Sequence, residues 1–254
     1  MVRPESPSAD PPPAHDQHGF RGQLEWGQPG VRLLAGRADL VVIVDVLSFS
    51  TAVSVAVERG AAVVPYRHRD GSAMDHARSI GAIFASPNRG APGPTLSPAS
   101  LVVLRPDETL LLPSPNGSTC ALLAAEAGAM VVAGSLRNAG AVGRFAASRG
   151  WTTAVIAAGE AWPDGGLRPT VEDLIGAGAI LAAFATASLS PEARAAVAAF
   201  RDVRDDLAAA IGASASGREL VDAGFERDLP IATELDATEL VPVLVDGAFR
   251  SWVR

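Results

Sequence analysis

Residues 40–46 read LVVIVDV, an almost unbroken run of β-branched side chains with a carboxylate, Asp45, near its end. Such a run predicts a strand buried on both faces, because a strand with one face in water alternates apolar and polar residues. A helical pattern follows over residues 51–59, with Ser50 as its N-cap and Gly60 as its stop. A buried strand that leads directly into a helix is typical of an α/β fold with a mainly parallel sheet.

Strand and helix patterns keep alternating along the rest of the chain. Strands are predicted at 61–66, 82–85, 100–104, 109–112, 129–133 and 152–157, and helices at 118–127, 137–148, 170–187 and from 191 onward. Two final strands, 241–245 and 248–253, flank Asp246-Gly247, a hairpin signal. We therefore expect one three-layer α/β/α domain over residues 23–254, whose mainly parallel sheet is made mixed by the C-terminal hairpin. Residues 1–22 are Pro-rich and polar and are predicted to be a disordered tail.

The composition narrows the classes of function. The 254 residues carry 21 basic and 28 acidic side chains, a net charge of −7, which argues against nucleic acid or an anionic membrane as a partner. Every basic residue is arginine, which excludes a Schiff-base lysine and a P-loop lysine. Cys120 is the single cysteine and excludes an internal disulfide. With no apolar run of roughly 18 residues and no signal-peptide pattern, we expect a cytoplasmic protein; self-association stays open.

Polar, donor-rich segments follow three of the predicted strands. Their candidate binding residues are Ser50 and Thr51 after Asp45, then Asn116, Gly117 and Ser118, and finally Ser135 and Asn138. In a parallel sheet the strand ends meet at one edge, where ligands bind, and N–H and hydroxyl donors at helix starts suit an anion. Each junction taken alone also fits a turn or a helix cap. Their repetition favours one anion site.

The longest polar stretch inside the predicted fold, residues 158–173, adds further candidates. It contains Glu160 and Arg168 and ends in Glu172 and Asp173 at a helix start. Carboxylates suit Mg²⁺, and an arginine can clamp a phosphate. Asp45 and Asp173 are the predicted metal ligands, and both, with Glu172, are the catalytic candidates; Asp173 also fits a helix capping box.

Five segments, in order, resemble the 2-phosphosulfolactate phosphatase family. They are VVIVDVLSFSTAV from residue 41, SPNGST from 114, GSLRNAGAVG from 134, VEDLIGAGAI from 171 and AGFERDLPIATELDATELVPVLVDG from 223. The resemblance implies a three-layer α/β fold and Mg²⁺-dependent cleavage of phosphosulfolactate to sulfolactate and phosphate, on a route to coenzyme M. It implies pocket roles for most of the candidates above and adds Asp228.

The chain departs from the family's pattern at three positions. Ser48 stands where the family has an arginine, Ala157 where it has a cysteine, and Leu96 where it has an asparagine. The lost arginine removes a cation expected near the bound anion. We expect another arginine to replace it, and the candidates are Arg168, Arg89 and Arg137.

The residues and the resemblance together predict a Mg²⁺-dependent phosphatase that acts on a small anionic phosphate monoester, with 2-phosphosulfolactate as the leading substrate. Direct attack by water and a covalent phosphoenzyme both stay open, because no activated nucleophile stands out. Two alternatives also stay open: a family member that cleaves another phosphate ester, and a non-catalytic protein that binds a small anion.

Overall fold

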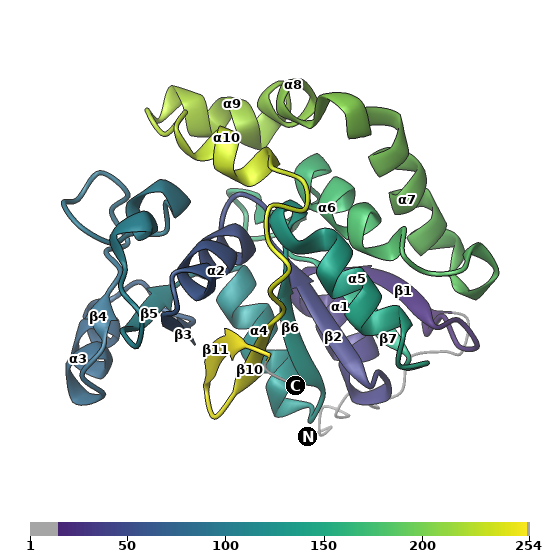
Figure 1. Cartoon of the computed structure of the whole chain (residues 1–254), viewed down its shortest axis with the longest axis horizontal. Coiled ribbons are helices and arrows are strands. Elements are labelled where there is room, and N and C mark those ends of the chain that lie inside the picture. Colours follow the sequence, from purple (N-terminus) through teal and green to yellow (C-terminus); the bar gives the residue numbers. More distant parts are fainter. Residues whose placement is uncertain (1–14, 253–254) are drawn as a thin grey trace, which may run out of the picture.

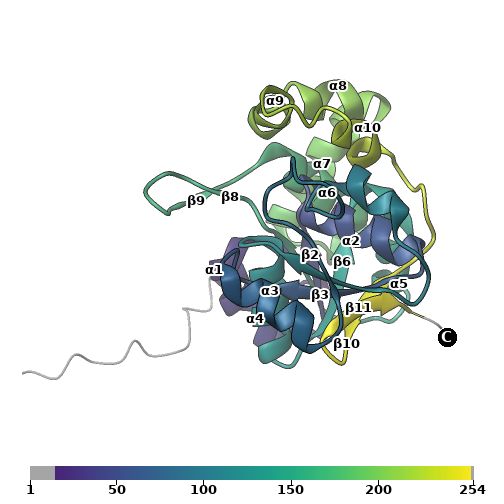
Figure 2. The ribbon, with the colours of Figure 1, turned by 90° about the vertical axis from the view of Figure 1, so that its left-hand side faces the viewer.

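Residues 15–252, the part of the chain that the structure describes, form a nine-stranded mixed sheet with helices on both faces (Figure 1). The strands of this computed structural model are β1 (Gly22–Trp26), β2 (Leu40–Val44), β3 (Ala62–Tyr66), β4 (Ile83–Phe84), β5 (Thr109–Pro113), β6 (Met130–Gly134), β7 (Thr153–Ala157), β10 (Pro242–Val245) and β11 (Ala248–Ser251). A separate ribbon, β8 (Glu160–Ala161) and β9 (Leu167–Arg168), projects from the body of the protein (Figure 2).

The C-terminal hairpin lies inside the sheet, whose order is β1-β7-β2-β6-β10-β11-β3-β5-β4. β10 pairs antiparallel with β6, and β11 pairs antiparallel with β3. The remaining neighbours are parallel, in one group of four strands and one of three. The predicted mixed sheet and hairpin are confirmed. Because three successive antiparallel pairs separate the two parallel groups, these groups run in opposite directions, which the prediction of a mainly parallel sheet did not include.

Ten helices in residues 15–252 surround the sheet. They are α1 (Gly27–Leu34), α2 (Phe49–Glu58), α3 (Gly71–Ser79), α4 (Gly117–Glu126), α5 (Ala139–Ala147), α6 (Val171–Leu181), α7 (Pro191–Val203), α8 (Leu207–Gly212), α9 (Ala215–Asp222) and α10 (Asp228–Thr233). The last three gather at one end of the molecule (Figure 1).

The central strand β2 shows why the fold has three layers. Val41 and Ile43 pack in one hydrophobic cluster with α1, α2 and α4, whereas Val42 and Val44 pack in a second cluster with α5, α6 and α7. All four side chains are fully buried. Successive side chains of a strand point to opposite faces, so a strand that is apolar throughout needs a helix layer on each side. The predicted three-layer architecture is therefore confirmed.

Three local predictions need correction. Residues 100–104 are not a strand, because a 3₁₀ helix occupies Pro98–Val103; Pro98 suits a helix start, and Val102 and Val103 are exposed, so this apolar run is not buried. The helix predicted over 170–187 ends at Leu181. The helix after β2 begins at Phe49, so its N-cap is Ser48 and not Ser50.

The first two elements of the domain, β1 and α1, were not predicted from the sequence. Their sequences, GQLEW and GQPGVRLL, contain glycines and polar residues that interrupt the apolar periodicity of a strand or a helix. Of the predicted tail, residues 1–14 lie outside the described residues. Residues 15–22 contact the sheet, since the Gln17 side chain donates to the carbonyl of Leu24 at 2.7 Å and Gly22 already belongs to β1.

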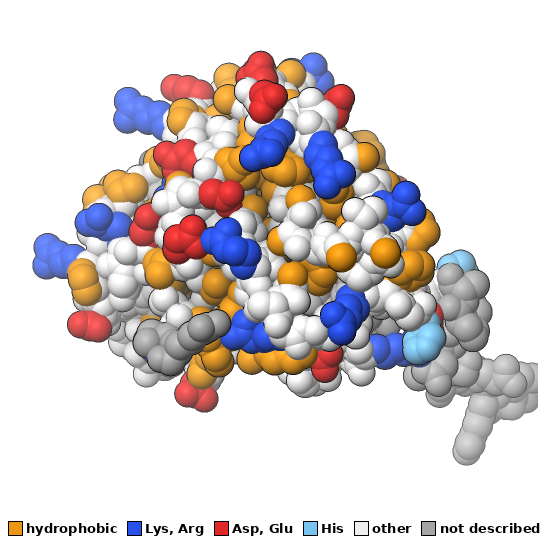
Figure 3. All heavy atoms as spheres, turned by 45° about the vertical axis from the view of Figure 1, so that its right-hand side comes forward, with side chains coloured by type: hydrophobic (Ala, Val, Ile, Leu, Met, Phe, Trp, Pro, Cys, Tyr) orange, Lys and Arg blue, Asp and Glu red, His pale blue; other side chains and the backbone are white. Residues whose placement is uncertain are grey.

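Two surface properties of the described residues concern membranes and charge. Within residues 15–252, none of the helices has both the length and the apolar character that crossing a membrane requires. On the face drawn in Figure 3, basic and acidic side chains are interspersed with apolar and neutral ones. This face therefore carries no continuous basic patch of the kind that tracks a nucleic-acid backbone.

Candidate active site

Asp45 lies directly after β2, and its carboxylate is almost fully buried. It accepts hydrogen bonds from the backbone N–H groups of Phe49 and Gly117, both at 3.0 Å. Burial, reinforced by the nearby charge of Glu160, raises the pKa of Asp45 to about 7. A carboxyl group with such a pKa can exchange a proton near neutral pH, which is what acid–base chemistry requires.

Gly117 brings the start of α4 against Asp45. A Cβ atom at this position would lie 2.3 Å from Cδ1 of Phe49 and 2.7 Å from Oδ2 of Asp45. No side chain fits there without movement, so glycine is what allows the N–H to reach the carboxylate. The predicted meeting of the junctions after β2 and β5 is therefore observed, although the two strands belong to opposed groups of the sheet.

The hydroxyl groups predicted to bind an anion here stabilise the backbone instead. Ser50 Oγ donates to the carbonyl of Asp45 at 2.9 Å, and Thr51 Oγ1 donates to the carbonyl of Val46 at 2.8 Å. Ser118 Oγ donates to the carbonyl of Leu112 at 3.0 Å. All three side chains are fully buried. In this structure they shape the two strand-to-helix turns around Asp45.

Asp173 holds two strand ends together. Its carboxylate accepts hydrogen bonds from the N–H of Val46 at 2.7 Å, the N–H of Gly159 at 2.8 Å and the hydroxyl of Thr170 at 2.9 Å. Burial, with a further contribution from the negative charge of Asp45, raises the pKa of Asp173 well above its usual range. These bonds connect the turn after β2 to the loop after β7, so Asp173 positions the segment that carries Asp45.

Glu172 and Arg168 make their contacts on the side of α9. Glu172 is buried and accepts a 3.5 Å hydrogen bond from Ser214 Oγ, and burial raises its pKa. Arg168 donates two hydrogen bonds to the carboxylate of Glu219, at 3.0 and 2.7 Å. Neither side chain bonds to Asp45 or to the backbone groups that donate to it. Asp173, the residue after Glu172, instead binds the turn that carries Asp45.

Ser135 and Asn138 close a turn of their own after β6. The N–H of Ser135 donates to Oδ1 of Asn138 at 2.8 Å, and Nδ2 of Asn138 donates to the carbonyl of Ala133 at 3.2 Å. Both side chains are fully buried in this capping box. Their polar atoms therefore shape the end of β6, and no hydrogen bond in the described part of the chain joins them to Asp45 or Asn116.

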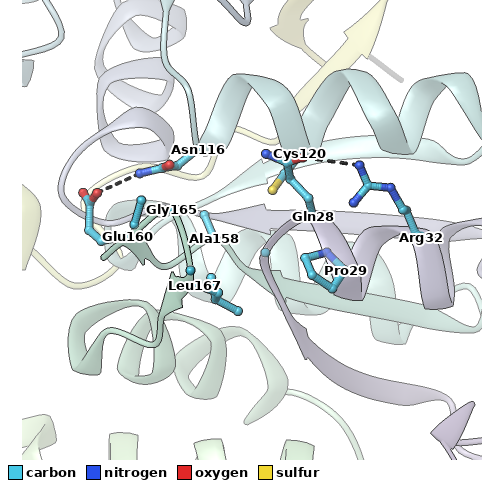
Figure 4. A pocket seen from close by; sticks show the side chains of 12 residues that line it. Gln28, Pro29, Arg32, Asn116, Cys120, Ala158, Glu160, Gly165 and Leu167 are labelled. Carbon is cyan, nitrogen blue, oxygen red and sulfur yellow. Dashed lines mark hydrogen bonds between the residues drawn. The ribbon is translucent and has the colours of Figure 1, made fainter. Parts of the chain in front are cut away.

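A cavity of about 260 Å³ lies beside Asn116, the residue before Gly117. At one end, Asn116 Nδ2 donates to Glu160 Oε2 at 2.9 Å (Figure 4). Toward the other end lie Gln28 and Arg32 of α1. Because Glu160 acts electrostatically on Asp45, the first end of the cavity adjoins the buried carboxylate. The sequence did not indicate Gln28 and Arg32, since α1 itself was not predicted.

Of the three arginines proposed to replace the cation lost at Ser48, Arg89 reaches that position. Its Nη2 donates to Ser48 Oγ at 2.9 Å, and its Nη1 donates to Oδ2 of Asp228 at 3.1 Å. Its positive charge also acts on Asp45 and Glu160. Arg137, by contrast, pairs with Glu58 and Glu234, and Arg168 pairs with Glu219, as described above.

Asp228 holds Arg89 in place. The side chain of Asp228 is 1% exposed and also accepts hydrogen bonds from Ser97 Oγ and, at 3.2 Å, from the N–H of Ala99. An acid buried this deeply requires such partners. The residue indicated only by resemblance therefore lies next to the Asp45 site, as an anchor for its cation.

The donor set suits a magnesium ion that keeps part of its water shell. Among residues 15–252, no three His, Cys, Asp or Glu side chains form a ready-made metal cluster. Mg²⁺ is commonly held by one or two carboxylates, with water and substrate oxygens completing the octahedron. Asp45 and Glu160 are two such carboxylates, and their mutual repulsion, which contributes to the raised pKa of Asp45, is what a bound dication would relieve.

The fold and this site define an α/β protein with a buried acid, flanked by a second acid and an arginine, beside a small cavity. A family model described as 2-phosphosulpholactate phosphatase matches residues 32–247. This match covers well over half of the chain, so the chain belongs to that family, which is a family of phosphatases. A search of curated proteins found no match.

Proposed function

We propose that the protein hydrolyses 2-phosphosulfolactate to sulfolactate and phosphate and that it requires Mg²⁺. The observation that carries the proposal is the arrangement around Asp45, whose buried carboxyl group lies near Glu160 and the guanidinium of Arg89. Family membership supports the reaction type and the substrate.

Asp45 and Glu160 would hold the metal, together with the side-chain oxygen of Asn116. When bound, Mg²⁺ would polarise the phosphoryl group and neutralise its charge. Asp173 was the other predicted ligand, but its carboxylate already accepts three hydrogen bonds from the protein. We therefore assign Asp173 to positioning the Asp45 turn.

The residues of the chain supply the remaining chemistry. Arg89 binds phosphoryl oxygens and stabilises their charge, while Asp228 fixes its orientation. The N–H groups of Phe49 and Gly117 hold the Asp45 carboxylate in place. In one route Asp45 accepts a proton from the attacking water while the P–O ester bond breaks, and it passes that proton to the departing sulfolactate oxygen. In the other route Asp45 attacks phosphorus and the sulfolactate oxygen leaves and takes a proton from solvent water. A second water molecule then hydrolyses the aspartyl phosphate, which releases phosphate and regenerates Asp45.

The proposal also covers the setting of the reaction. The net charge of −7 argues against nucleic acid as a partner, and the single cysteine suits a cytoplasmic setting.

The test is phosphate release from 2-phosphosulfolactate and from a panel of small phosphate esters, each with Mg²⁺ and with EDTA. We expect release only with Mg²⁺ and fastest from 2-phosphosulfolactate. Asp45→Asn should lower kcat by roughly a hundredfold or more, and Glu160→Gln should raise the Mg²⁺ concentration needed for half-maximal rate. Glu192, an exposed acid on α7, provides the matched control, and Glu192→Gln should change neither value.

The panel separates the alternatives. Faster Mg²⁺-dependent release from another ester would keep the chemistry and reject the substrate. No release from any ester by folded protein would reject the phosphatase and leave a protein that binds a small anion.

A further inference from the structure

The cavity beside the site has two chemically different ends. Glu160 and Asn116 lie at the end that adjoins Asp45, whereas Gln28 and Arg32 lie toward the other (Figure 4). Ala158 and Leu167 lie between these two ends, and Pro29 lies beside Gln28 and Arg32. A ligand that fills this cavity therefore meets acidic oxygens, then apolar surface, and then a guanidinium.

Arg32 is free to bind an anion. Its Nη2 donates to the neutral side-chain oxygen of Gln28 at 3.4 Å, and within residues 15–252 no acidic side chain pairs with it. Its charge also acts on the thiol of Cys120, which lines the same cavity. Arg89 and Arg137, in contrast, are each paired with at least one carboxylate.

We propose that Arg32, with Gln28, forms a distal subsite that recognises a second acidic group of the substrate. The inference rests on the proposed function, which places the phosphate at the Asp45 end. The three-carbon skeleton of the substrate would then lie against the apolar middle of the cavity, and its terminal sulfonate would accept hydrogen bonds from the Arg32 guanidinium and the Gln28 amide.

The size of the cavity limits the substrate class. Its volume of about 260 Å³ lies below the roughly 300–1,000 Å³ of pockets that hold drug-sized ligands. The subsite therefore selects phosphate esters of short hydroxy acids that carry an anion at the far end, and it disfavours neutral esters of the same length.

The experiment compares wild type with Arg32→Ala and Arg32→Lys on three substrates. In 2-phosphoglycerate a hydroxyl replaces the sulfonate of 2-phosphosulfolactate, and glycerol 2-phosphate also lacks the carboxylate. Arg32→Ala should raise KM for 2-phosphosulfolactate by roughly ten- to a hundredfold, the range of one lost charge-assisted hydrogen bond. The kcat of Arg32→Ala should fall less than threefold. The KM of Arg32→Lys should lie between those of wild type and Arg32→Ala. For glycerol 2-phosphate, kcat/KM should change less than twofold.

Arg201, an exposed arginine on α7, provides the matched control. Arg201→Ala should leave kcat and KM unchanged for all three substrates. An equal loss on all three substrates, or an unchanged KM for 2-phosphosulfolactate, would overturn the subsite. If wild type cleaves no ester, the proposed function fails, and the subsite is then decided by calorimetric binding of sulfolactate. Binding that weakens at least tenfold in Arg32→Ala supports it, and absent or unchanged binding rejects it.

Discussion

Replacing Gly117 by alanine tests whether the close approach of α4 holds the buried acid. The new Cβ would stand 2.3 Å from Cδ1 of Phe49 and 2.7 Å from Oδ2 of Asp45. Phe49 cannot move aside easily, because it is fully buried and packs edge-on against Phe249, with ring centroids 6.0 Å apart. The start of α4 must shift instead, which lengthens the hydrogen bond from the N–H of residue 117 to Asp45.

The magnitude follows from two contributions. Overpacking a core position by one methyl group costs about 1–3 kcal/mol. Losing a hydrogen bond to a charged acceptor costs about 1.5–3 kcal/mol. Alanine recovers up to about 1 kcal/mol through its better helix propensity, although residue 117 is only the first position of α4. The free energy of unfolding should therefore fall by about 1.5–6 kcal/mol.

The assay is urea unfolding at pH 7, with Gly36→Ala as the matched control. Gly36 has open space around its Cβ position and an ordinary φ, so that variant should stay within about 0.5 kcal/mol of wild type. The Gly117 N–H favours the ionised form of Asp45, so its loss should also move the acidic limb of the pH–rate profile upward. A Gly117→Ala protein with wild-type unfolding midpoint and pH profile would refute this account of Asp45.

Two further predictions concern charge. The folded pKa of Asp45, about 7, lies above its usual value of 3.8, so the folded state keeps a proton that the unfolded state releases. As the pH rises from about 4 to 7, the free energy of unfolding of the metal-free protein should therefore fall, by up to about 4 kcal/mol from Asp45 alone. Asp45→Asn should flatten that fall in urea unfolding at pH 5 and 8, and an equally steep fall would contradict the assignment. For the cation, Arg89→Met should lower kcat/KM at least tenfold, because it removes the charge beside Ser48. Arg168→Met should change kcat/KM less than twofold, because Arg168 pairs with the exposed Glu219. A larger loss for Arg168→Met than for Arg89→Met would reverse their roles.

The sequence could predict the layers because β2 alone carries their signature. Five consecutive apolar residues leave no face for water, and this observation implies helices on both sides of the sheet. The order of the strands was not predictable, since the single bridges Val243–Val132 and Phe249–Val63 that seat the hairpin inside the sheet are long-range contacts. No local pattern encodes them.

The candidate site was predictable only where a strand end determined it. Asp45 follows β2 directly, so its place at the sheet edge could be inferred. Glu172 and Asp173 could not be told apart, because neighbouring helix positions differ by about 100° in direction, and they bond to different parts of the protein. Ser135 and Asn138 had the composition of an anion-binding turn, but the same donors and acceptors satisfied each other.

Arg89 illustrates how a binding group can change its position in the sequence and keep its place in the site. It lies in a loop rich in Gly and Pro that has no apolar periodicity, so the local sequence does not predict where its side chain lies in the fold. Its location comes from Asp228, the first residue of α10, which ties the guanidinium to Ser48 across long sequence separations. Because Asp228 also binds Ser97 and Ala99, the cation and its loop are held by one buried acid. A cation supplied in this way depends on the docking of α10, and the geometry of the anion site is therefore coupled to the helical end of the molecule.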